Sequence, residues 1–308
     1  MIKTVVSTAL PIDERVLIRK NVWSHGTGTK RICIVTGTHG DELEGQYVCF
    51  RLNQIMQEKA DKLDGTLEIY PALNPLGIDS ITRGIPNFDL DMNRIFPGDP
   101  DGTMAEHAAY AILHDLQGAD MVIDIHSSNI FLREIPQVRI NINTSDRLVP
   151  YARLLNIDFI WVHEAATVLE ATLAHSLNSL DTPTLVVEMG VGMRVNHGYG
   201  NRLVTGILNL MHAMGMWSEA PEPHLITTPV VSVADEVSFI NAEASGVFLT
   251  ETRNNIVVDE GEEIGCIVSP LTGEVFQRVT ATTHGLLFTL RAYPVVYQGS
   301  LLARIHYL

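Results

Sequence analysis

The segment from Arg31 to Gly45, which reads RICIVTGTHGDELEG, constrains the fold of this chain more than any other stretch. The run from Ile32 to Val35 has the length and β-branching of a buried strand. Gly37 and Gly40 then allow a tight turn, and the acidic residues that follow favour the first turn of a helix, where the helix dipole stabilises negative charge. The segment therefore predicts a strand, a tight turn and a helix in direct succession.

Two side chains in this turn, His39 and Glu42, are suited to binding a metal ion. They are three residues apart, so a helix that begins near Gly40 would direct both toward one point, as two ligands of one cation require. A simpler interpretation is that His39 caps the turn and Glu42 interacts only with the helix dipole. The segment alone does not decide between a metal site and a structural turn.

Composition narrows the class of protein. A chain of 308 residues with 46% hydrophobic and 19% charged residues can bury a full core, as one large domain or as a catalytic domain with a smaller one. The net charge of -15 argues against nucleic acid as a partner, because phosphate binding needs a clustered basic surface. Cys33, Cys49 and Cys266 are far apart and form no C-x-x-C pair, so neither a disulfide framework nor a thiolate zinc site is expected.

The sequence contains no apolar run near the roughly 18 residues that a membrane span needs, so we expect no membrane partner. Its N-terminus has only a brief apolar patch that ends at Pro11, without the hydrophobic region and cleavage site of a secretion signal. We therefore expect a cytoplasmic location and a small molecule or peptide as the partner.

Strands and helices alternate along the first two thirds of the chain, which predicts a mostly parallel or mixed sheet covered by helices on both faces. Further strands are predicted at 14–20, 67–71, 121–125, 159–162 and 184–187, and helices around 48–55, 104–117, 145–155 and 199–215. Ligands of such sheets gather at the carboxyl ends of the strands, and His39, His126 and Glu188 each follow a predicted strand. The stretch from 74 to 100 is too long for a simple connection, so we expect its loops to carry function.

A domain boundary is predicted after this region. Residues 218–229 contain three prolines and are typical of a linker. The sequence then changes to short β-rich runs separated by glycine, which predicts a small β-sandwich or barrel. We therefore divide the chain into a catalytic α/β domain at 1–217, a linker at 218–229 and an all-β capping domain at 230–308.

Four motifs of this chain resemble, in order, those of the succinylglutamate desuccinylase/aspartoacylase family, which lies within the zinc carboxypeptidase superfamily. They are GTHGDE at 37–42, DMNRIF at 91–96, DIHSS at 124–128 and VEMG at 187–190. The resemblance covers roughly residues 31–192. It implies a zinc carboxypeptidase-like α/β domain followed by a small all-β domain.

Position by position, the resemblance implies that His39, Glu42 and His126 bind one zinc ion per chain and that Glu188 is the general base. Two imidazoles and one carboxylate leave a fourth tetrahedral position for water, as in catalytic zinc sites. Zinc lowers the pKa of such a water to about 7, and a nearby carboxylate can take its proton. Asp124 either orients a ligand or only packs against the strand.

The same resemblance extends to the expected loops. Arg83 is similar in placement to the family's arginine that stabilises the developing oxyanion, and Asn93 and Arg94 resemble the pair that binds a substrate carboxylate. A guanidinium group is planar and can bind a carboxylate through two hydrogen bonds, so Arg94 suits this role. The alternative for either arginine is an ion pair at the surface.

Other polar residues carry no motif. Arg133 and Arg139 follow His126 closely and could line the pocket. The aspartoacylase branch of the family uses a further arginine and a tyrosine with its acidic substrate. Tyr293 and Tyr297 are the candidates for that tyrosine, and the match of both the arginine and the tyrosine stays open. We do not expect four further histidines to bind the metal, namely His107, His114, His163 and His175.

The resemblance implies a zinc-dependent amidohydrolase that cleaves an N-acyl amino acid or a similar small carboxylate-bearing amide. A zinc carboxypeptidase for short peptides uses the same zinc, base and carboxylate clamp, so it stays open as an alternative, and pocket volume would separate the two. A non-catalytic metal-binding module is a third interpretation, against which the presence of Glu188 beside all three ligands argues. The acyl group, the amine and the oligomeric state stay open, and a homodimer is suggested by the resemblance alone.

Overall fold

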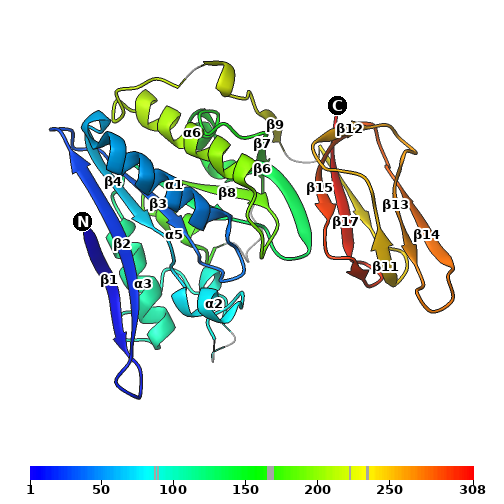
Figure 1. Ribbon diagram of the computed structural model, residues 1–308, viewed down its shortest axis with the longest axis horizontal. Helices are drawn as coiled ribbons and strands as arrows, with labels where there is room; N and C mark the ends of the chain where they lie inside the picture. Colours follow the sequence, from blue (N-terminus) through cyan, green and yellow to red (C-terminus); the bar gives the residue numbers. More distant parts are fainter. Residues whose placement is uncertain (87, 89, 165–169, 222, 234–235) are drawn as a thin grey trace.

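The computed structural model describes residues 1–86, 88, 90–164, 170–221, 223–233 and 236–308. An α/β region that holds the N-terminus lies beside an all-β region that holds the C-terminus (Figure 1). The predicted fold class, a mixed sheet flanked by helices with an all-β C-terminal region, is confirmed. In the described part of the chain, every helix is too short or too polar to cross a lipid bilayer.

The α/β region is built on the first part of a 13-stranded sheet in the order β1-β2-β4-β3-β5-β8-β6. Pairing is parallel between β3 and β4, β3 and β5, and β5 and β8, and antiparallel at β1, β2 and β6. Its strands are β1 (Ile2–Ala9), β2 (Arg15–His25), β3 (Arg31–Thr36), β4 (Gly65–Tyr70), β5 (Met121–His126), β6 (Leu132–Asn141), β7 (Phe159–His163), β8 (Thr184–Gly190) and β9 (Val230–Val233).

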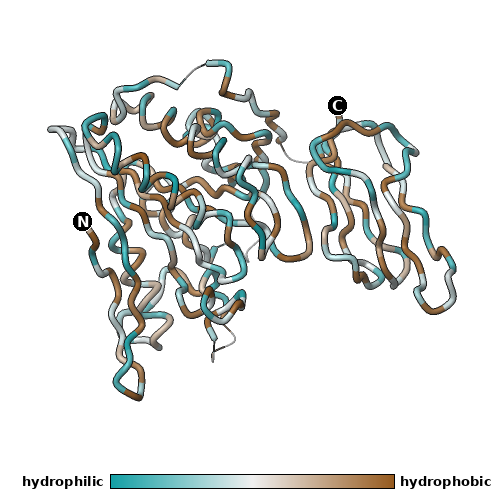
Figure 2. Tube along the Cα trace, viewed as in Figure 1, coloured by the Kyte–Doolittle hydropathy of each residue, from teal (hydrophilic) through white to brown (hydrophobic). Residues whose placement is uncertain are grey.

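Helices cover both faces of this sheet. They are α1 (Glu44–Lys59), α2 (Pro75–Ser80), α3 (Met104–Leu116), α4 (Ser145–Ala152), α5 (Leu173–Ser179) and α6 (His197–Ala213), with 3-10 turns η1 (Ala60–Lys62), η2 (Met92–Arg94), η3 (Ile142–Thr144) and η5 (Pro223–Leu225). Strand β3 is buried on both faces, as predicted: Ile32 and Ile34 face the core under α1 and α6, whereas Cys33 and Val35 face the core under α3 and α5. Hydrophobic residues recur along these strands and the helices beside them (Figure 2).

The all-β region continues the same sheet. Strand β15 pairs antiparallel with β6, and β17, β10 and β12 follow, while β14, β13, β11 and β16 form a second sheet. The strands are β10 (Val237–Asn241), β11 (Gly246–Leu249), β12 (Ile256–Val258), β13 (Glu263–Val268), β14 (Val275–Thr280), β15 (Gly285–Arg291), β16 (Val295–Val296) and β17 (Leu301–Tyr307). The division at 217 and 230 stays a prediction. Strand β9, inside the predicted third segment, pairs with β7 of the α/β region.

Several elements escaped the sequence analysis. Strands β1 and β6 and helix α5 were not predicted, and the stretch from 74 to 100 contains α2 and η2 between its loops. Pro136 and the charged residues Arg133, Glu134 and Arg139 conceal β6, because they interrupt a clear period of two. Residues 87 and 89 of the predicted loops and residue 222 of the predicted linker lie outside the described residues.

A buried ionic cluster joins β2, β4 and α3. The Lys20 ammonium lies 3.0 Å from Glu68 Oε2 and 2.7 Å from Asp115 Oδ2, and it donates to the Tyr70 hydroxyl at 3.1 Å. Burial by itself would raise the pKa of Glu68, but Lys20, the Tyr70 hydroxyl and Arg31 hold that pKa below its usual value. Lys20 therefore compensates the charge of the buried Glu68 carboxylate.

We expect Lys20→Met to lower the free energy of unfolding by about 3 kcal/mol, because the substitution leaves Glu68 in the core without its ammonium partner. Urea denaturation followed by circular dichroism measures this change. Lys59→Met is the matched control, since Lys59 pairs with Glu219 at the surface and should leave the denaturation midpoint unchanged. Equal midpoints for the two variants would contradict the structural role of Lys20.

Candidate metal and catalytic site

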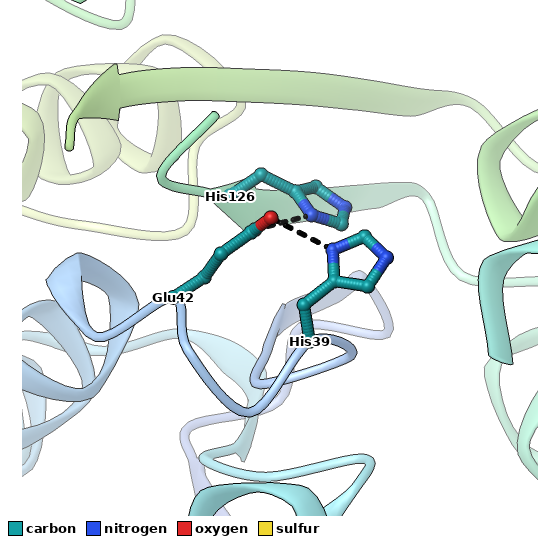
Figure 3. A group of neighbouring side chains, drawn as sticks. All are labelled: His39, Glu42 and His126. Atoms are coloured by element: carbon teal, nitrogen blue, oxygen red, sulfur yellow. Dashed lines mark hydrogen bonds and ion pairs between the residues drawn. The ribbon is translucent and has the colours of Figure 1, made fainter. Parts of the chain in front are cut away.

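His39, Glu42 and His126 meet at the carboxyl ends of two neighbouring strands. His39 and Glu42 follow β3, and His126 is the last residue of β5, which pairs in parallel with β3. One ligand atom from each residue lies within 4.8 Å of those of the other two, and the side chains point toward one another (Figure 3). Their exposed fractions are 3%, 2% and 4%. In the described part of the chain, this is the group of ionisable side chains suited to holding a metal ion.

The turn after β3 produces this convergence. Gly37 adopts a φ of 67°, which favours glycine, and Gly40 packs so closely on the backbone of Gly77 that a Cβ atom would collide with it. Helix α1 begins at Glu44, so the expectation of a helix start near Gly40 is wrong. His39 and Glu42 instead approach each other in a tight turn, in which the Glu42 N–H donates to the His39 carbonyl at 3.3 Å.

Both imidazole rings direct Nδ1 toward the same carboxylate. His39 Nδ1 lies 2.8 Å from Glu42 Oε1, and His126 Nδ1 lies 2.8 Å from Glu42 Oε2. The opposite ring nitrogens face other carboxylates: His39 Nε2 is 2.9 Å from Asp91 Oδ1, and His126 Nε2 is 3.2 Å from Asp124 Oδ2. Metal-binding histidines typically have this arrangement, with one nitrogen on the ion and the other oriented by a carboxylate.

The electrostatics of the group also fit a cation. Burial opposes charge on each member, yet Asp124 and Glu42 hold the pKa of His126 well above its usual value. Burial likewise opposes charge on Glu42, and the two imidazoles hold its pKa well below the usual range. Ser127 N–H donates to Glu42 Oε2 at 3.1 Å and fixes the carboxylate further. Two imidazoles and one anionic carboxylate are a donor set that suits zinc.

Glu188 lies beside this group on the adjacent strand. It is in β8, in register with His126 of β5, and it is 9% exposed. Its Oε2 accepts a hydrogen bond from the Ser128 N–H at 2.6 Å, and its Oε1 is 3.4 Å from Arg139 Nη1. Burial raises the pKa of Glu188 against the opposing effects of Arg139 and His126. A carboxylate with a raised pKa is better suited to accept a proton near neutral pH.

Arg83 contacts the same group from the loop side. Its Nη1 donates to Glu42 Oε1 at 2.9 Å, its Nη2 lies 3.5 Å from Asp91 Oδ2, and 39% of its side chain is exposed. Arg83 thus forms ion pairs, as the alternative interpretation expected. Its partners, however, are the carboxylates of Glu42 and Asp91 in the candidate site. Its exposed part faces the pocket that the group opens into.

Asn93 and Arg94 belong to the 3-10 turn η2. Asp91 begins this turn, and its side chain accepts from the Asn93 N–H at 2.8 Å while also contacting His39. Asn93 Oδ1 accepts from the Leu173 N–H at 2.9 Å, which fixes the amide. Arg94 Nη1 donates to the Asn93 carbonyl at 2.7 Å, and among the described residues no carboxylate lies within ion-pair distance of Arg94. Its guanidinium charge is therefore available to a ligand.

One pocket of about 760 Å³ connects these residues. His39, Glu42, Arg83, Asn93, Arg94, His126 and Glu188 all line it, as do Arg139, Trp161, His163, His175 and Arg304. Both Arg133 and Arg139 were candidates for the pocket lining. Arg139 lines the pocket, whereas Arg133 is exposed and lies outside it. Arg304 comes from β17 and was missed, since the sequence around it has no motif.

The remaining candidates are not part of the His39–Glu42–His126 group. Tyr293 is 44% exposed and Tyr297 is 73% exposed, and neither is a lining residue of the pocket. His163 and His175 line the pocket but do not join the three-residue group. His107 and His114 interact with backbone carbonyls on α3 and in the loop before it.

Comparisons with known proteins agree with the family resemblance of the four motifs. The family model of the succinylglutamate desuccinylase/aspartoacylase catalytic domain matches residues 28–214. The chain is 33% identical over 122 residues to N-alpha-acetyl-L-2,4-diaminobutyric acid deacetylase of Halomonas elongata, and this alignment covers 39% of the chain and 35% of that relative. The chain thus spans about a third of the length of the curated relative that it matches.

Two solved structures have the same fold. The product-bound ectoine utilization protein EutE (DoeB) from Ruegeria pomeroyi is 22% identical with a TM-score of 0.80, over 96% of this chain and 90% of that one. A succinylglutamate desuccinylase from Silicibacter sp. TM1040 is 23% identical with a TM-score of 0.82, over 95% and 89% of the two chains. Both similarities extend across the α/β and all-β regions.

Proposed function

Because this chain belongs to the succinylglutamate desuccinylase/aspartoacylase family, we propose that it is a zinc-dependent amidohydrolase that removes the acyl group from an N-acyl amino acid or a similar small carboxylate-bearing amide. The observation that carries the proposal is the buried His39–Glu42–His126 group, with Glu188 beside it in one pocket. The name of the Halomonas elongata relative supports the substrate class, since it describes a deacetylase of an N-acetylated amino acid.

His39, Glu42 and His126 would hold the ion through Nδ1, a carboxylate oxygen and Nδ1. Bound there, zinc would supply a Lewis acid that activates water and polarises an amide carbonyl. Asp91 and Asp124 orient the two imidazoles from their outer nitrogens. Three protein ligands leave the open position that catalytic sites need.

Glu188 acts as the general base in this proposal. Its carboxylate accepts a proton from the attacking water and delivers it to the departing amine nitrogen. The Ser128 N–H fixes one carboxylate oxygen, and Arg139 lies near the other. Burial raises the pKa of Glu188, which makes its carboxylate a stronger base for taking up the proton.

Two arginines would bind the substrate on the loop side of the pocket. Arg94 pairs with the substrate carboxylate, helped by the neighbouring Asn93, because its guanidinium has no carboxylate partner among the described residues. Arg83 keeps part of its guanidinium exposed to the pocket while Glu42 and Asp91 hold the rest. It is therefore suited to stabilise negative charge that develops on the carbonyl oxygen.

A zinc carboxypeptidase for short peptides stays the second candidate. A pocket of about 760 Å³ accommodates a dipeptide as well as an N-acyl amino acid. The non-catalytic metal-binding module requires an idle base, whereas Glu188 is buried and held from two sides. The cytoplasmic location, the absence of nucleic acid and membrane partners, and the homodimer stay predictions from the sequence.

We expect the zinc-loaded protein to release amine from one class among N-acetyl, N-succinyl and N-formyl amino acids, and a chelator to abolish this release. A ninhydrin-type amine assay over this panel, with dipeptides included, measures it. Turnover confined to dipeptides would support the carboxypeptidase instead. Silence of the fully metallated protein on the whole panel would refute the proposed function.

The variants Glu188→Gln and His126→Ala should differ in zinc content, which distinguishes a general base from a metal ligand. Glu188→Gln should retain zinc and lose kcat by about 100-fold or more, since the amide cannot accept the proton. His126→Ala should lose both the metal and the activity, because it removes a coordinating nitrogen. Metal analysis by mass spectrometry and steady-state kinetics measure both effects.

His175→Ala is the matched control for these two variants, since His175 lines the same pocket outside the metal group. It should keep its zinc. A Glu188→Gln variant with near wild-type kcat would remove Glu188 from the role of base, and unchanged zinc in His126→Ala would remove His126 from the ligand set.

Arg94→Ala should lower kcat/KM roughly 10- to 100-fold for a substrate with a free carboxylate, because a charge-assisted hydrogen-bond pair is lost. The loss should be small for the corresponding carboxamide, which carries no charge. Arg133→Ala, an exposed arginine outside the pocket, is the control and should change neither substrate. Equal losses of kcat/KM on the carboxylate and the carboxamide substrate would contradict the role of Arg94 in binding the substrate carboxylate.

A further inference from the structure

A chain of alternating charges connects Glu188 with the last strand of the molecule. Glu188 Oε1 lies 3.4 Å from Arg139 Nη1, and Arg139 Nη2 lies 2.8 Å from both carboxylate oxygens of Glu134. Arg304 Nη1 in turn donates to Glu134 Oε1 at 2.7 Å. Two carboxylates and two guanidinium groups thus alternate without interruption from β8 through β6 to β17.

The register of the sheet produces this alignment. In β6, Glu134 is opposite Thr289 of β15, and Thr289 is opposite Arg304 of β17. The Thr289 hydroxyl also donates to Glu134 Oε1 at 3.4 Å. The three residues therefore form a row across strands of the α/β and all-β regions, which lie next to each other in Figure 1.

Packing restricts both guanidinium groups. The guanidinium carbon of Arg139 is 5.8 Å from the centre of the Trp161 ring, and that of Arg304 is 5.4 Å from the same ring. Arg304 also lies over Phe239, at 5.6 Å from the ring centre. Such contacts favour a fixed position of the cation over an aromatic face.

Loss of any one of the four groups leaves the cluster with an unbalanced charge. Glu134 is fully buried and contacts both arginines. Burial by itself would lower the pKa of Arg139, but Glu134 and Glu188 hold that pKa above its usual value. If Arg304 were absent, Arg139 would be the single cation between two carboxylates of low exposure, and the fully buried Glu134 would draw it away from Glu188.

We propose that Arg139 is a positioning residue that holds the Glu188 carboxylate beside the metal group, and that Arg304 keeps Arg139 in place through Glu134. The inference rests on the proposed function, in which Glu188 is the general base. With the Ser128 N–H on one oxygen and Arg139 near the other, the Glu188 carboxylate is fixed at two points. The all-β region thereby contributes to the geometry of the base as well as to the pocket wall.

Arg304→Met in the zinc-loaded full chain tests the proposal. We expect kcat to fall about tenfold while KM changes by less than about twofold, because a displaced base affects the chemical step more than substrate binding. Arg304→Lys retains a cation for Glu134 but loses the planar guanidinium that lies over Trp161, so its kcat should fall less than that of Arg304→Met. Arg278→Met, which removes an exposed pair with Glu263 in the same all-β region, should change neither constant.

The decisive variant is the double substitution Glu134→Gln/Arg304→Met. It removes the carboxylate that competes for Arg139, so we expect it to recover most of the kcat that Arg304→Met loses. A merely structural role of the ion pair predicts instead that the second substitution adds to the loss. An additive loss of kcat in the double variant would overturn the proposal. So would a wild-type kcat in Arg304→Met, or an effect of Arg304→Met on KM alone.

Crystal structures of the same variants give a readout that needs no substrate. In Arg304→Met the distance from Arg139 Nη1 to Glu188 Oε1 should exceed the 3.4 Å of the wild type, and in the double variant it should return. An unchanged distance in Arg304→Met would refute the positioning of Arg139. If the wild-type protein hydrolyses nothing on the panel, the proposed function is wrong. The Arg139–Glu188 distances in the variants still test whether Arg139 and Arg304 position Glu188.

Discussion

The Glu42 carboxylate is the group on which the candidate site depends. It is 2% exposed and is contacted by His39, His126, Arg83 and the Ser127 N–H. A carboxylate removed from water to this extent is strongly unfavourable unless hydrogen bonds and positive charge surround it. Its four contacts come from the turn after β3, the end of β5 and the loop that holds Arg83. The position of one carboxylate thus links three separate segments of the chain.

The central sheet supplies the rigidity that this arrangement needs. Strands β3, β5 and β8 are adjacent and parallel, and β3 and β5 have cores packed on both faces. His126 and Glu188 occupy matching positions near the ends of β5 and β8, so the backbone pairing between these strands fixes the distance between the proposed metal ligand and the proposed base. Side chains at strand ends are held more precisely than side chains in loops. Arg83 and Arg94, which come from the long connection, gain their order from contacts with Asp91, Glu42 and Asn93.

The sequence predicted those parts of the molecule whose signal is local. The apolar run of β3 and the glycines that follow it indicated the strand and the turn, and the motifs at 37–42, 91–96, 124–128 and 187–190 indicated residues that the fold brings into one pocket. Strand β6 was missed because Pro136 and its charged residues interrupt the alternation, and one partner that stabilises the buried Glu134, Arg304, lies 170 positions away. Arg304 itself carries no local signal, since only the pairing of β6 with β15 and β17 places it at the pocket. The first residue of helix α1 could not be predicted from the local sequence either. The chain makes a turn at Gly40 that packs closely against Gly77, which is distant in the sequence.

The same pairing determines what the all-β region can do. A cover attached only by a flexible linker could swing and change the volume of the pocket. Here β15 continues the sheet of the α/β region through β6, and the buried Glu134 binds an arginine from each side of that junction. Separating the two regions would therefore expose a sheet edge and leave Glu134 with one partner fewer. The pocket wall that Arg304 contributes is consequently anchored to the central sheet by backbone pairing as well as by the buried Glu134.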